Sequence, residues 1–212
     1  MSKRLQKILS AIPRCHTLAD VGCDHGYIGI GALQSEVCSH VLFVDISAPS
    51  LQKASNALPV HLKERAEFFV RDGIGDLQCD CAVIAGMGGL EIISILTNTV
   101  TLPKWLVLQP MRNQVDIRQY LLNNYNIVSD TKFADGKFYD LIVAQLSESK
   151  QALSPLELTF GLTNIACPSQ DFVQFLLVEQ AKAQNILQHC PTAPVKDYLE
   201  QVNAVLARTE EI

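Results

Sequence analysis

A short loop between two apolar segments carries the first residues that could do chemistry. The stretch LADVGCDHGYIGI, residues 18–30, ends an apolar run at Asp20, turns through Gly22 and Gly26, and enters a candidate helix. A dinucleotide-binding loop has a second glycine where the backbone approaches a pyrophosphate, and Asp24 occupies that place here. Its charge would repel a pyrophosphate but not a cationic ligand without phosphate. S-adenosylmethionine is such a ligand, and we expect Asp20 and Asp24 to face its amino end.

Two further acids follow the next two apolar segments. Asp45 closes the second segment, where a carboxylate can accept hydrogen bonds from both ribose hydroxyls of an adenosyl ligand. Asp72 and Gly73 follow the third, where an aspartate can accept from an adenine amino group. Each acid alone is more often a turn residue. Because the carboxyl ends of parallel strands share the ligand crevice of an open sheet, the acids together predict an adenosyl site.

The fourth apolar segment runs into IAGMGG, residues 84–89, whose glycines let the backbone approach a ligand above the sheet. The simpler interpretation is a tight strand-to-helix connection. In methyltransferases this place faces the transferred methyl group. It contains neither the Asn/Asp-Pro-Pro-aromatic motif of exocyclic amine methylation nor a Pro-Cys nucleophile, which favours a ring nitrogen as acceptor. The predicted cofactor-binding residues are Asp20, Gly22, Cys23, Gly26, Asp45, Ile46, Asp72, Gly73, Ile74, Ala85, Gly86, Met87 and Gly88.

Alternating strand and helix patterns must position these residues. An amphipathic first helix stops at Pro13, and the later pattern predicts an open, mostly parallel α/β sheet that ends in an antiparallel hairpin over 126–146. After a linker at 150–155, two helices are separated by residues 190–194 and predict a helical hairpin. The predicted strands are 17–21, 40–46, 66–70, 80–85 and 104–109, and the predicted helices are 27–36, 48–63, 88–97, 113–124, 169–190 and 195–208.

The composition indicates a globular chain with one sizeable core. Its 212 residues carry a formal net charge of −5, and no apolar run approaches the length of a transmembrane helix. The seven cysteines form no CxxC pair and the histidines are scattered, so we expect reduced thiols, no metal site and a cytoplasmic protein. The negative net charge argues against a protein whose whole surface binds nucleic acid, but it allows a local basic patch.

Several segments together resemble the bacterial tRNA (adenine-22, N1) methyltransferases. They are SKRLQKILSAIP at the first helix, VGCDHGYI, IAGMGG, LQP at 108–110 and DGKFYDLIVA at 135–144, and the resemblance reaches the C-terminal helix pair. It implies a Rossmann-like class I methyltransferase domain, residues 1–149, followed by a coiled-coil-like helical extension, residues 155–212. It also implies S-adenosylmethionine as cofactor and tRNA as substrate. The chain departs from the family pattern at Met111, where the family generally has Asn.

The chemistry expected from this resemblance is an in-line transfer of a methyl group to adenine N1, which already has a lone pair in the ring plane. Asp24 and His25 are the candidate catalytic residues, because a carboxylate would stabilise the positive charge that develops on the ring. N1 lies on the Watson–Crick edge, so a paired target base must be exposed or flipped out. The candidate RNA-binding residues are Lys3, Arg4, Lys7, Arg112 and Arg118.

Other functions stay open at this point. Met111 and the acidic charge motivate a methyltransferase that acts on another RNA position or on a small molecule. A non-catalytic module that binds the cofactor would use the same fold. A dehydrogenase is the weakest alternative, since Asp24 opposes a pyrophosphate. The sequence leaves the oligomeric state undetermined.

Overall fold

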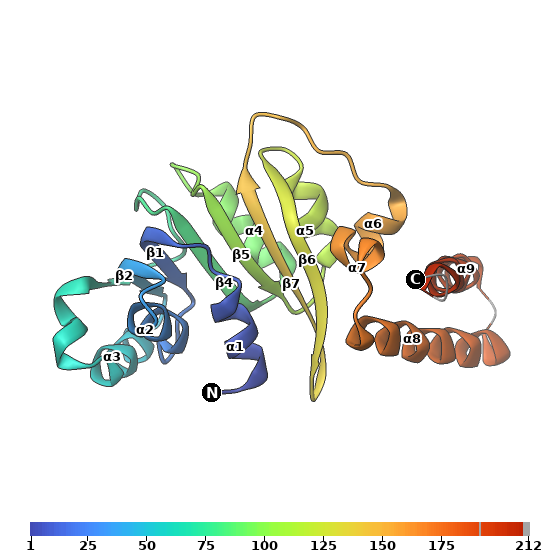
Figure 1. Cartoon of the computed structure of the whole chain (residues 1–212), viewed down its shortest axis with the longest axis horizontal. Coiled ribbons are helices and arrows are strands. Elements are labelled where there is room, and N and C mark those ends of the chain that lie inside the picture. Colours follow the sequence, from blue (N-terminus) through green and yellow to red (C-terminus); the bar gives the residue numbers. More distant parts are fainter. Residues whose placement is uncertain (191, 210–212) are drawn as a thin grey trace.

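Figure 1 shows the chain as a computed structural model, which describes residues 1–190 and 192–209. Residue 191 falls in the predicted break between the C-terminal helices, and residues 210–212 end the predicted extension. These four positions lie outside the described residues.

A seven-stranded sheet of order β3-β2-β1-β4-β5-β7-β6 forms the centre of the molecule. Strand β7 is antiparallel to both of its neighbours, and the other adjacent pairs are parallel. The predicted sheet with a terminal antiparallel hairpin is therefore confirmed. The strands are β1 (Cys15–Val21), β2 (Cys38–Asp45), β3 (Ala66–Val70), β4 (Cys81–Met87), β5 (Trp105–Pro110), β6 (Tyr125–Asp135) and β7 (Lys137–Leu146).

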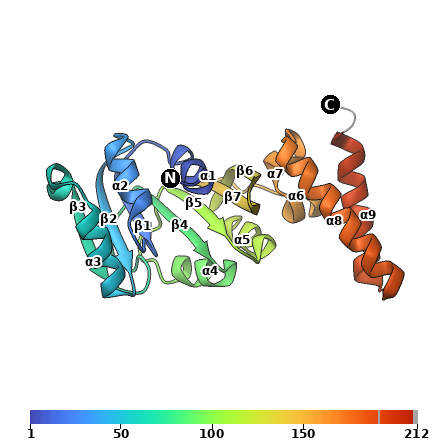
Figure 2. The same cartoon turned by 90° about the horizontal axis from the view of Figure 1, so that it is seen from below.

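Helices cover both faces of this sheet (Figure 2). One face packs α1 (Lys3–Ser10), α2 (Tyr27–Gln34) and α3 (Ala48–Ala57), and the other packs α4 (Gly89–Thr97) and α5 (Gln114–Leu121). Successive side chains of a strand point to opposite faces. In β2, Phe43 accordingly joins the first core, whereas Leu42 and Val44 join the second. Burial on both faces explains why these strands are nearly continuous apolar runs.

The helix predicted over 48–63 is divided in the structure. Helix α3 ends at Ala57, and a 3-10 helix, η1 (Val60–Arg65), follows Pro59. The ring of a proline clashes with a helical conformation of the residue before it, and Leu58 accordingly has an extended backbone with ψ of 124°. The prediction of one continuous α-helix over 48–63 was therefore wrong for residues 58–63.

The C-terminal helices lie beside β6, at one end of the sheet (Figure 1). They are α6 (Pro155–Phe160), α7 (Leu162–Ala166), α8 (Gln170–His189) and α9 (Ala193–Thr209). The long helices α8 and α9 enclose a small core of Phe172, Leu176, Val202 and Val205. The short α6 and α7 were not predicted, although Ser154 and Glu157 form a capping box at the start of α6. None of the described helices is long and apolar enough to cross a membrane.

A buried ion cluster joins this helical part to the sheet. Arg118 of α5 is fully buried and donates to Asp130 from Nε at 2.7 Å and from Nη2 at 3.0 Å. It also reaches Asp140 at 3.1 Å, and Lys132 Nζ lies 2.6 Å from the other oxygen of Asp140. Burial opposes the charged guanidinium, but the two carboxylates outweigh it and raise the pKa of Arg118. The prediction that Arg118 binds RNA is wrong, because its side chain is enclosed by these partners.

Candidate active site

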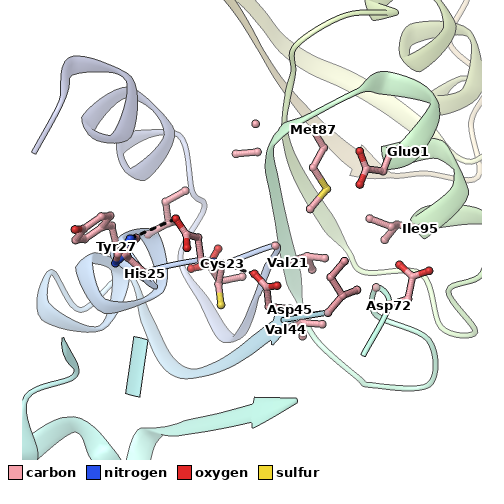
Figure 3. Close-up of a pocket in the computed structure, with 18 of the residues that line it drawn as sticks. Val21, Cys23, His25, Tyr27, Val44, Asp45, Asp72, Met87, Glu91 and Ile95 are labelled. Atoms are coloured by element: carbon pink, nitrogen blue, oxygen red, sulfur yellow. Dashed lines mark hydrogen bonds and ion pairs between the residues drawn. The ribbon is translucent and has the colours of Figure 1, made fainter. Parts of the chain in front are cut away.

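A cavity of about 520 Å³ opens at the carboxyl ends of β1, β2 and β4. Figure 3 shows its arrangement, with His25 and Tyr27 on one side, Asp45 and Cys23 between, and Met87, Glu91 and Ile95 opposite. Five carboxylates line it, against two arginines and one histidine. The acids are Asp20, Asp24, Asp45, Asp72 and Glu91, and the arginines are Arg4 and Arg71.

The carboxylate of Asp20 occupies the N-terminus of α2. Its Oδ2 accepts a hydrogen bond of 2.9 Å from the Gly29 backbone N–H in the first turn of that helix, where Gly26 provides no side-chain cap. Burial raises the pKa of Asp20 to about 7, and nearby Asp45 adds to the shift, while the Gly29 N–H opposes it. A helix N-terminus is where phosphates bind in dinucleotide folds. Here the protein's own carboxyl group takes that position.

Asp45 holds the first loop against the end of β2. Its Oδ2 accepts from the Asp24 backbone N–H at 3.0 Å, and its Oδ1 accepts from the Ser47 N–H at 2.9 Å. Asp24 has a left-handed backbone with φ of 47°, a conformation that aspartate tolerates better than most residues. Both Asp45 oxygens keep a second lone pair in a half-buried position at the cavity wall.

The side chains of Asp24 and His25 lie at the rim of the cavity. The Asp24 side chain is 63% exposed, and its Oδ2 lies 3.6 Å from His25 Nε2. On its other side, Oδ1 lies 3.9 Å from Lys53 Nζ. The His25 ring stacks on Tyr27 with ring centroids 5.3 Å apart (Figure 3). The exclusion of a pyrophosphate therefore depends more on buried Asp20 than on exposed Asp24.

Two glycines keep the centre of the cavity open. A Cβ on Gly22 would collide with the methyl group of Met87, and φ of +68° at Gly22 disfavours any other residue. Gly86 has φ of +81° at the end of β4, and a Cβ there would lie 3.4 Å from Arg4 Nη1. Both glycines line the cavity, and a side chain at either position would crowd Met87 or Arg4 there.

Most of the predicted cofactor residues line this cavity, but three do not. Gly26 lies beneath the loop, where a Cβ would meet Ala54 at 2.8 Å and Phe43 at 3.0 Å. Ile74 is fully buried in the core beside α4. Gly88 faces Arg112 on the far side of its loop. The residues of the set that line the cavity are Asp20, Gly22, Cys23, Asp45, Ile46, Asp72, Gly73, Ala85, Gly86 and Met87.

Sequence reasoning missed several residues of the cavity wall. Glu91 is the clearest case, because it is an acid in the first turn of the helix that follows IAGMGG. Arg71 directly precedes the predicted Asp72. Arg4 and Leu5 come from α1, whose approach to the cavity no local pattern reveals. The missed lining residues are Leu5, Val21, Tyr27, Ile28, Val44, Arg71, Glu91 and Ile95, with Arg4 predicted only as an RNA contact.

The remaining basic residues of the predicted RNA set lie on the surface around α1 and after β5. Lys3 pairs with Asp171 of α8 at 3.2 Å, and Lys7 is exposed one turn further along α1. Arg112 is exposed in the loop between β5 and α5. Of the predicted set, Arg118 alone is enclosed in the core.

Comparisons with known proteins agree with this geometry. The methyltransferase domain family matches residues 1–142. The tRNA (adenine(22)-N(1))-methyltransferase of Bacillus subtilis is 29% identical over 171 residues, which cover 76% of this chain and 72% of that protein. A Streptococcus agalactiae protein of the NADB-Rossmann superfamily is 28% identical with a TM-score of 0.89 and 97% coverage of both chains. A Streptococcus pneumoniae structure in complex with S-adenosyl-L-methionine is 26% identical with a TM-score of 0.87, covering 97% of this chain and 99% of that one. The cavity, the sheet and the matched residues lead to one conclusion: the chain belongs to the methyltransferase domain family.

Proposed function

We propose that this protein is an S-adenosylmethionine-dependent methyltransferase that methylates N1 of adenine 22 in tRNA. The observation that carries the proposal is the position of Asp20 at the N-terminus of α2, in a cavity with five carboxylates. Such a cavity repels a pyrophosphate and attracts a cationic adenosyl ligand. The similarity to a Bacillus subtilis enzyme named for adenine 22 supports the choice of substrate.

The residues present fit this cofactor. Asp45 would offer lone pairs to the ribose hydroxyls, and Asp72 and Gly73 would border the adenine. The lining at Gly22 and Gly86 would take the amino-acid end beside Asp20. When bound, S-adenosylmethionine supplies an electrophilic methyl group on its sulfonium.

The chain's own contribution to transfer is to position the acceptor and to stabilise charge. Adenine N1 has a lone pair at neutral pH, so no side chain has to remove a proton from it before the transfer. The methylated ring becomes cationic, and the Asp24 carboxylate at the rim stabilises that charge. His25 stacks on Tyr27 and accompanies Asp24 on the same side of the cavity.

The exposed cations Lys3, Lys7 and Arg112 are the candidate contacts to tRNA phosphates, with residues 1–149 as the methyltransferase domain and 155–212 as the helical extension. Phosphate contacts of this kind release counterions, so binding should weaken as salt rises. The target base must leave its stack to reach the cavity, because N1 lies on its pairing edge.

The decisive experiment measures methyl incorporation into unmodified tRNA transcripts, followed by nucleoside analysis. We expect 1-methyladenine from a transcript with adenine at position 22 and no product when that base is guanine. A methylated base other than 1-methyladenine would contradict the substrate and favour another RNA position. Calorimetric titration with S-adenosylhomocysteine and NAD separates the remaining alternatives. Binding of S-adenosylhomocysteine without turnover on any RNA would indicate a non-catalytic module.

A further inference from the structure

Arg4 is a cation at the wall of an otherwise acidic cavity. Of the two arginines that line it, Arg71 is paired with Asp76 at 2.8 Å. Within residues 1–190 and 192–209, Arg4 has no carboxylate within 4.0 Å of its guanidinium. Its charge is therefore uncompensated by the described part of the chain.

The position of this guanidinium is fixed from several sides. Nη1 donates to Oε1 of Gln109 at 3.0 Å, and the amide nitrogen of the fully buried Gln109 lies 3.2 Å from the Pro110 carbonyl oxygen. The Arg4 backbone N–H donates to Asp135 Oδ2 at 2.9 Å, and the guanidinium carbon lies 5.7 Å from the centre of the Tyr139 ring. A neutral amide takes only one of the five donors of an arginine, so the others remain for a ligand.

The strand order places Arg4 at a defined end of the cavity. Gln109 and Gly86 are the last residues but one of β5 and β4, and a Cβ on Gly86 would lie 3.4 Å from Arg4 Nη1. Asp45 and Asp72 follow β2 and β3, on the other side of β1 in the order β3-β2-β1-β4-β5. A ligand whose adenosine lies at Asp45 and Asp72 therefore extends its other end toward β4 and Arg4.

We propose that Arg4 binds the carboxylate at the methionine end of S-adenosylmethionine. This assignment rests on the proposed function, and it moves Arg4 from the predicted RNA contacts to the cofactor site. The carboxylate is the single anionic group of that cofactor, and the five acids of the cavity would repel it. An arginine supplies a planar pair of donors that matches a carboxylate and offsets this repulsion.

The test compares two ligands that differ only in this carboxylate, S-adenosylmethionine and decarboxylated S-adenosylmethionine, by isothermal titration calorimetry on the full chain. The wild type should bind the first about 10- to 100-fold more tightly, as expected for a charge-assisted contact. The Arg4→Gln variant should lose that preference, because it should bind S-adenosylmethionine more weakly and the decarboxylated ligand as tightly as before. Lys7→Gln removes an exposed charge from the same helix and should keep the wild-type preference.

Other outcomes would overturn the assignment. Equal binding of both ligands by the wild type rejects it without any variant, even if Arg4→Gln fails to fold. A variant that weakens both ligands equally would show that Arg4 only supports the structure. If Arg4→Gln kept the preference for S-adenosylmethionine but bound tRNA more weakly in a filter assay, Arg4 would be an RNA contact instead. If the wild type binds neither ligand, the proposed function fails and this assignment falls with it.

Discussion

Asp20 shows how one carboxyl group changes the ligand class of a common loop. Its oxygen satisfies a free N–H in the first turn of α2, at the place where other folds bind a phosphate. The same group lines the cavity while only 3% of the residue is exposed. Burial raises its pKa to about 7, so that its charge changes within the physiological range.

This pKa predicts opposite effects of pH on stability and on ligand binding. The folded pKa of about 7 lies above the ordinary value near 3.9, so the neutral form stabilises the fold fully below pH ~4. That contribution is lost as the pH rises through about 7. The affinity for S-adenosylmethionine should instead rise from pH 6 to pH 8, because the ionised carboxyl attracts its cationic groups.

Calorimetry at several pH values checks this prediction with two variants. Asp20→Asn cannot ionise, and its affinity should vary much less between pH 6 and pH 8. The exposed Asp197→Asn on α9 should behave like the wild type. If Asp20→Asn kept the wild-type pH dependence, the titrating group would not be Asp20.

At the scale of elements, the buried ion cluster connects α5, the β6–β7 hairpin and α6. Besides its carboxylate partners, Arg118 Nη1 donates to the backbone oxygens of Leu158 and Thr159 at 3.0 and 3.2 Å. Buried charges are costly unless they are paired and hydrogen-bonded, and this cluster satisfies both conditions. Removing Arg118 takes away the partner of Asp130 and one of the two partners of Asp140.

A matched pair of arginine variants tests the cluster. Arg118→Ala should lower the free energy of unfolding by about 3–5 kcal/mol, because it takes away the cationic partner of buried Asp130 and leaves Asp140 with Lys132 alone. The exposed Arg112→Ala should change it by about 0.5 kcal/mol or less. For tRNA binding we expect the opposite order, with the larger effect from Arg112→Ala. That variant should weaken the affinity for tRNA and lower the slope of its salt dependence by about 1, the value expected for the loss of one phosphate contact. Urea denaturation measures the stability of the two variants, and binding assays at several salt concentrations measure their affinity for tRNA. Equal losses of stability in the two variants would contradict the structural role of Arg118.

The strands and the hairpin can be predicted from local sequence, but the contacts of Arg118 and Arg4 cannot. The apolar runs that form β1 to β5 and the turn at Gly136 identify strands and hairpin, because burial on both faces and a tight turn each require particular residues. The role of Arg118 was missed because its partners Asp130 and Asp140 lie 12 and 22 residues away, in a register set by strand pairing. The approach of Arg4 to the cavity also depends on distant residues, Gln109 and Asp135. Local patterns carry no information about such contacts.

At the scale of the whole molecule, the helical extension is bonded to the sheet through polar groups along β6. The Thr163 hydroxyl accepts from the Asp130 N–H, and the Asn164 side chain accepts from the Lys132 N–H, both in the middle of that strand. Asp171 of α8 accepts from the Ala134 N–H and also pairs with Lys3. These contacts satisfy backbone groups on the outer side of the last strand, which would otherwise be an open edge.

Two truncations test whether the extension is needed by the rest of the chain. A chain ending at residue 149 loses all of these contacts and should unfold at a clearly lower temperature than the full protein. A chain ending at residue 168 keeps α6 and α7, with Thr163 and Asn164, and should recover much of the stability. Differential scanning calorimetry measures the transitions. Equal melting temperatures for the full chain and the chain ending at 149 would show two independent domains.

The contacts of α1 have a consequence for how the protein is made. Lys3 and Arg4 are synthesised long before their partners Gln109, Asp135 and Asp171. The wall that α1 contributes to the cavity can be placed only after Gln109 and Asp135 have also been synthesised. Domains generally fold as units. In this protein α1 must wait for the end of β6, and the cavity wall becomes complete only after that strand has been synthesised.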